Sequence, residues 1–202
     1  MKNSLKTALN AALTAMLLMG SVLTTAVAAE GKAMKLEFTN LPIRRVSVTG
    51  NTKVIIIQGN SDWVTMDDDD MDKVSLVQAG DELRISSTEK TPVTVTVHVR
   101  EIFRIKASNT ATVRTLGKFK VKYLQLMLKD NAVATIKANT ESLYTVINDH
   151  ASLELMGSTQ THYLKTDGMA KLKADKFAAL VIQPDSSENT SLVMNTGIKP
   201  KK

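Results

Sequence analysis

Hydrophobic and polar residues alternate along most of the chain beyond residue 43. The longest example is the run from Val93 to Val99, and shorter ones occur at Leu83 to Ile85 and at Leu124 to Leu128. A period of two places the hydrophobic side chains on one face of a β-strand, and β-branched residues suit that pleated surface. Only Lys171 to Leu180 has a pattern that allows a helical turn. The alternation therefore predicts an all-β fold.

A short motif recurs in the second half of the chain. A small or polar turn residue is followed three positions later by a small residue and five positions later by an aliphatic one. The copies are Ser108-Ala111-Val113, Asn131-Ala134-Ile136, Asn148-Ala151-Leu153, Asp167-Ala170-Leu172 and Ser187-Thr190-Leu192. The aliphatic positions lie 23, 17, 19 and 20 residues apart, which is typical of the windings of a solenoid.

Stacked windings of this length would bury their aliphatic residues together. No winding can bury its own apolar face alone, but windings spaced by about 4.8 Å pair laterally and share one core. We predict a short right-handed parallel β-helix with longer N-terminal strands and repeat windings over about residues 103–198. The predicted core column consists of Val113, Ile136, Leu153, Leu172 and Leu192.

The N-terminus has the pattern of an export signal. A cationic start, Met1 to Lys6, precedes an apolar run, Ala8 to Val27, that ends in small residues. We predict a signal peptide over residues 1–29 and one β-helical domain over 30–202. The alternative, a membrane anchor, is disfavoured by Asn10 and by the small residues at the cleavage site. The predicted location is the periplasm or the cell surface of a bacterium, with no transmembrane segment after cleavage.

Composition excludes several classes of function. The chain has no cysteine, which excludes disulfides, thiolate metal sites and thiol nucleophiles. Without Lys2 and Lys6, 24 basic residues face 20 acidic ones, a net charge of only +4. With one Trp, four Phe and three Tyr, the chain lacks the basic and aromatic platform of a nucleic-acid binder. Because no phosphate or dinucleotide loop occurs, we expect no cofactor.

Three segments of the first half resemble a known family. They are Val46 to Gly50, Val54 to Asn60 and Gly80 to Ile85, and with the repeats they cover about residues 43–198. They are similar to the GIN domain, the exported bacterial domain named as an autotransporter adhesin head. The resemblance implies a β-helical fold in an exported bacterial protein. The tripeptide that gives the family its name is replaced here by Asn51-Thr52-Lys53.

The most conspicuous charge cluster is an acidic run. Asp67, Asp68, Asp69 and Asp70 are weak candidates for a calcium site, because carboxylate oxygens are the ligands of that ion. In an extended segment, however, they would point to opposite sides, and no glycine-bearing loop with a distant glutamate accompanies them. We therefore expect a solvated turn between strands and no metal site.

Three polar residues occupy equivalent positions in the repeat. Asn131, Asn148 and Asp167 are predicted to stack at the turns as a structural ladder of side chains. The alternative is a ridge that binds a cation or a sugar.

These observations favour a protein without catalytic activity. We predict an adhesin-like binding or structural module of the envelope or surface, with a glycan or an envelope or surface protein as partner; the oligomeric state stays open. The alternative is a β-helix enzyme acting on polysaccharides, a lyase or hydrolase, supported only by analogy of fold. The sequence shows no clear pair of catalytic carboxylates, and its histidines, His98, His150 and His162, lack metal-binding spacing.

Overall fold

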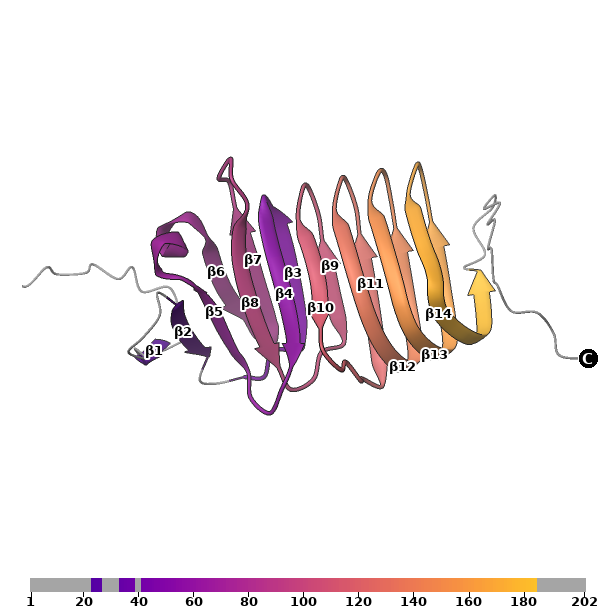
Figure 1. Ribbon diagram of the computed structural model, residues 1–202, viewed down its shortest axis with the longest axis horizontal. Coiled ribbons are helices and arrows are strands. Elements are labelled where there is room, and N and C mark those ends of the chain that lie inside the picture. The colour runs from indigo at the N-terminus through magenta and orange to yellow at the C-terminus, as the bar shows by residue number, and fades with distance from the viewer. Residues whose placement is uncertain (1–22, 27–32, 39–40, 185–202) are drawn as a thin grey trace, which may run out of the picture.

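The computed structural model describes residues 23–26, 33–38 and 41–184, and these residues form an all-β fold (Figure 1). The elements are β1 (Leu23–Ala26), β2 (Ala33–Phe38), β3 (Arg45–Gly50), β4 (Thr52–Gln58), β5 (Trp63–Asp67), the 3₁₀ helix η1 (Asp68–Lys73), β6 (Ser75–Ala79), β7 (Glu82–Ser87), β8 (Val93–Val99), β9 (Arg104–Ala107), β10 (Thr112–Leu116), β11 (Tyr123–Leu128), β12 (Val133–Ile147), β13 (Ser152–Thr166) and β14 (Lys171–Pro184). The strand β1 lies inside the segment predicted to be the signal peptide, and the rest of that segment lies outside the described residues.

From β3 onward, parallel strands form two facing layers. The β4 layer runs β8, β4, β10 and the first halves of β12, β13 and β14. The β3 layer runs β7, β3, β9, β11 and the second halves of the same three long strands. Because β12 pairs with β10 through its first half and with β11 through its second, the sheet curls back over itself there (Figure 1). At the indigo end, β5 and β6 add antiparallel strands.

Spacing near twenty residues holds only from β9 onward, where Arg104 pairs with Gln125. Thr112, Val133, Ser152 and Lys171 pair in register across neighbouring strands, in steps of 21, 19 and 19 residues. Before that point, chain order and stacking order differ, because the unit β3–β4 lies between β7–β8 and β9–β10. A solenoid that simply stacked in chain order would not show this arrangement.

Two expectations about local structure are wrong. The longest strands are C-terminal: β12 and β13 have 15 residues each and β14 has 14, whereas β3 to β11 have 4 to 7. They are long because the backbone stays extended where one layer passes into the other, whereas β4 ends at Gln58 before a turn. The helical turn that the sequence allows at Lys171 to Leu180 is also absent, because that segment belongs to β14 and pairs with β13, with one register shift between Glu154 and Met156. Pairing with a neighbour outweighs a weak local preference.

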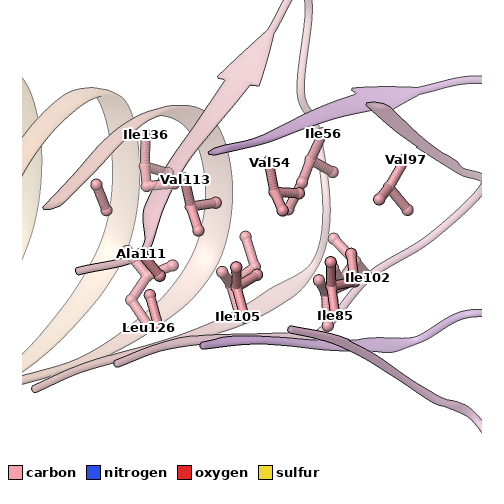
Figure 2. Close-up of a cluster of buried hydrophobic side chains, with 14 of the residues drawn as sticks. Val54, Ile56, Ile85, Val97, Ile102, Ile105, Ala111, Val113, Leu126 and Ile136 are labelled. Atoms are coloured by element: carbon pink, nitrogen blue, oxygen red, sulfur yellow. The ribbon is translucent and has the colours of Figure 1, made fainter. Parts of the chain in front are cut away.

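The core lies between the two layers. Figure 2 shows side chains such as Val54 and Val113 from the β4 layer facing Ile85, Ile105 and Leu126 from the β3 layer. All five are fully buried. Each buried aliphatic side chain of this size contributes about 1.5–3 kcal/mol to folding. Alternation along each strand thus supplies one inward and one outward set of side chains.

The predicted core column is partly misaligned. Val113 pairs with Ala134, Ala134 with Leu153, and Leu153 with Leu172. Ile136 does not belong to this row; it is buried two positions further along, where it pairs with Leu155. Leu172 is partly buried near the last described winding. Leu192, the fifth predicted member, lies outside the described residues.

Candidate functional site

A groove of about 320 Å³ crosses the outer face of the β3 layer. One residue from each of four neighbouring strands lies along it in register: Ser47 of β3, Lys106 of β9, Met127 of β11 and Val146 of β12. These residues alternate with buried ones, so their side chains point away from the core. The remaining lining residues are Ala107, Ser108, Leu128, Lys129 and Asn148. Four rigid strands therefore position the groove.

Two lysines give the groove a positive charge. Lys106 is half-buried, and no described residue forms a hydrogen bond or an ion pair with its ammonium group. The Lys129 Nζ lies 4.0 Å from Asp130 Oδ2, a long and exposed contact that offsets little of its charge. The groove lining contains no carboxylate. An anion would therefore be attracted to this site.

Asn148 lines the groove, but its Oδ1 is buried and not presented to a ligand. No described donor forms a hydrogen bond with this oxygen. A buried polar atom without a partner costs about 1–3 kcal/mol.

The predicted ladder of Asn131, Asn148 and Asp167 is not formed. Asn148 and Asp167 occupy equivalent positions, since their strands are in register, but Asn131 lies two positions later in its own turn. Their side chains do not bond to one another: Asn148 Oδ1 has no partner among the described residues, and Asp167 Oδ1 accepts from Gly168 N at 2.7 Å.

The turns are instead organised by the residue that follows Asn148 and by the equivalent residues of the two preceding windings. Asn109, Asp130 and Asp149 adopt φ values of 59°, 59° and 58°, a left-handed conformation that Asn and Asp tolerate. Asp130 Oδ2 accepts a hydrogen bond from Asn109 N at 2.9 Å, and Asp149 Oδ2 accepts one from Asp130 N at 3.1 Å. Each aspartate therefore ties its winding to the preceding one.

The acidic run lies in the exposed connection between β5 and β6, and most of it is helical and not extended. Asp67 ends β5, while Asp68, Asp69 and Asp70 form the first turn of η1. Lys73 Nζ lies 2.9 Å from Asp70 Oδ1, a contact between residues three apart that a helical turn brings together. This hydrogen bond raises the pKa of Lys73. No group of three acidic, histidine or cysteine side chains within the described ranges is placed to hold a metal ion.

Two histidines have perturbed surroundings. His98 points outward and stacks on Trp63, with ring centroids 3.5 Å apart, and Lys35 Nζ lies 4.9 Å from the indole centroid. Partial burial, followed by the charge of Lys35, lowers the pKa of His98. His162 points into the core, where burial lowers its pKa to about 4. Its Nε2 lies 3.0 Å from Thr145 Oγ1.

No motif in the sequence points directly to the groove. Its four central residues are 59, 21 and 19 positions apart in the chain, and only the strand register brings them together. The lysines were indistinguishable from other surface lysines of the repeats. One clue could have been used. Lys106, Met127 and Val146 each occupy the outward position shortly before a turn, at equal spacing from the turn residue of their winding.

The sequence of these windings matches that of a known protein family. Residues 43–187 match the family described as "Putative auto-transporter adhesin, head GIN domain". The chain belongs to the GIN domain family. No curated protein matches this GIN domain.

Solved structures with the same fold come from Bacteroides and Parabacteroides species. A putative adhesin from Bacteroides fragilis has a TM-score of 0.63 and 11% identity, covering 76% of this GIN domain and 75% of that chain. A putative adhesin from Parabacteroides distasonis has a TM-score of 0.56 and 13% identity, covering 77% and 78%. A putative lipid binding protein from the same species has a TM-score of 0.54 and 12% identity, also covering 77% and 78%. At these identities the similarity shows the fold alone.

Within the described ranges, no helix of this GIN domain has the length and hydrophobicity needed to cross a bilayer.

Proposed function

We propose that this GIN domain is a non-catalytic, adhesin-like binding module of the bacterial envelope or surface, and that the groove across β3, β9, β11 and β12 is its ligand site. The observation that carries the proposal is the half-buried Lys106, which has no partner among the described residues and lies in a groove whose lining contains no carboxylate. Its ammonium group would gain a partner from a bound ligand.

The proposal includes the architecture and the export of the chain. Parallel pairing of windings 19 to 21 residues long supports a right-handed parallel β-helix from β9 onward, within one domain over residues 30–202. The cationic and apolar N-terminus supports a signal peptide over residues 1–29 and residence in the periplasm or at the cell surface. A rigid stack of strands suits a binding module, because strands hold their outward side chains at fixed spacing.

The charges around the groove support binding without catalysis. Hydrolysis of a glycoside needs two carboxyl groups about 5–9.5 Å apart, flanking the bond that is cleaved. The groove lining has none. At the neighbouring end of the β3 layer, Asp81 and Glu82 form ion pairs with Arg45 and Arg84. Their oxygens are therefore already engaged.

An array experiment tests the proposed site. The protein, expressed from the full chain, is applied to an array of bacterial glycans, lipids and envelope polymers beside the variant Val146→Trp, which fills the groove. The matched control is Thr135→Trp, since Thr135 lies on the same strand, is also half-buried and points outward from the opposite layer. We expect wild type and T135W to bind the same spots and V146W to bind none.

Two results would contradict the proposal. Wild-type protein that binds no spot above a heat-denatured sample would remove the binding function, and V146W binding as strongly as wild type would remove the groove.

A further inference from the structure

We infer that the groove selects a short acidic saccharide, one whose sugar rings carry carboxylate groups. This inference rests on the proposed function, because it names the ligand class of the same site. Two features of the lining define that ligand: an unpaired positive charge and a shallow apolar floor.

The charge calls for an anion. Lys106 lies on β9 and Lys129 directly follows β11, the neighbouring strand. Both line the groove, and of the two only Lys129 has a described acidic neighbour, Asp130 at 4.0 Å. Lys106, enclosed between Ser47 and Met127 of the neighbouring strands, is the stronger anion site because it is partly shielded from solvent. The Ser47 hydroxyl, next to Lys106 in the row, is a further donor to the same anion.

The floor and the size of the groove limit the apolar part of the ligand. Met127 and Val146 form a small apolar surface, suited to the C–H face of a sugar ring. Beneath them the space is filled, since Ala107 and Leu128 are each only 1% exposed. An acyl chain would find no cavity to enter and would stay in water. A volume of about 320 Å³ lies at the small end of ligand sites, which span about 300–1,000 Å³.

A titration with defined disaccharides tests the inference. The protein, labelled with ¹⁵N, is titrated at low salt with digalacturonate and with the neutral disaccharide cellobiose, and amide shifts report the affinity. We expect digalacturonate to bind about tenfold or more tightly than cellobiose, because a charge-assisted hydrogen bond is lost with the carboxylate. The shifted amides should include those of the groove lining.

Variants separate the lysine contact from unspecific charge. Lys106→Gln should weaken digalacturonate about tenfold, while Lys106→Arg should retain most of the affinity. The control is Lys137→Gln, which removes an equal charge from the opposite, outward face of β12, and it should leave the affinity unchanged.

The outcomes distinguish this inference from the proposed function. Equal binding of both disaccharides, or no effect of K106Q, would overturn the acidic-saccharide ligand. Preferential binding of phosphatidylglycerol vesicles or of a glutamate-rich peptide would also overturn it, yet loss of that binding in V146W would leave the groove standing as the site. Binding of nothing on the array would defeat both.

Discussion

His162 is a histidine enclosed by the last described windings. Its side chain is 2% exposed and lies in an inward row between Leu143 and Ile182. Thr145 Oγ1 lies 3.0 Å from its Nε2, and the Phe177 ring meets it edge-on with centroids 5.5 Å apart. None of these neighbours carries a charge that would stabilise an imidazolium. Burial therefore keeps the ring neutral and lowers its pKa from 6.5 to about 4.

The lowered pKa makes folding stability depend on pH. Below pH 6.5 the unfolded chain binds a proton on this residue that the folded protein does not bind until about pH 4. Stability is therefore complete above pH 6.5 and is lost as the pH falls toward 4. The gap between 6.5 and about 4, at about 1.4 kcal/mol per pH unit, corresponds to about 3.5 kcal/mol in all. About 2 kcal/mol of this loss is reached at pH 5.

The variant His162→Leu isolates this contribution. Leucine matches Leu143 in the same row, and it does not titrate. Urea unfolding followed by circular dichroism gives the free energy of unfolding at pH 8 and pH 5 for wild type, H162L and the control His150→Gln, an exposed histidine. Wild type and H150Q should lose about 2 kcal/mol more than H162L between the two pH values. Equal losses in wild type and H162L would refute the reasoning, whatever their stabilities at pH 8.

Three further predictions concern the fold. Gly50→Ala should destabilise the fold by more than about 2 kcal/mol, because an added Cβ would lie 2.0 Å from the Ser87 carbonyl oxygen. The control Gly80→Ala, whose added Cβ would have nothing within 4 Å, should cost only the strain of its φ of +62°. Thermal melting compares the two variants. Asp149→Ala should cost about 2 kcal/mol in urea unfolding through the lost acceptor for Asp130 N and the left-handed backbone, and D149N should cost less than half as much. Millimolar calcium should leave the melting temperature unchanged, since the acidic residues of η1 form no cage within the described ranges.

Alternation of hydrophobic and polar residues was enough to predict which side of each strand faces the core. In β8, the valines at alternate positions of Val93–Val99 are buried, and the residues between them point outward. Strand geometry turns successive side chains to opposite faces, so this property needs no knowledge of the neighbouring strands. The repeat likewise indicated windings near twenty residues for the second half of the chain. The predicted alignment of the repeat was wrong at Ile136. Ala132 and Ala134 both fit the small position of the repeat, and only the pairing of β12 with β10 shows which alignment is correct.

The order in which windings stack, and the surfaces that their outer faces form together, depend on pairing between distant strands. Nothing local places β3–β4 between β7–β8 and β9–β10. The groove depends on this order of strands, because it pairs Ser47 with Lys106, which lies 59 residues later in the chain. Alternation sets the direction of a side chain within one strand, whereas lateral position is set by hydrogen bonds between strands far apart in the chain. A binding surface made of one residue from each strand is therefore visible only once those strands are paired.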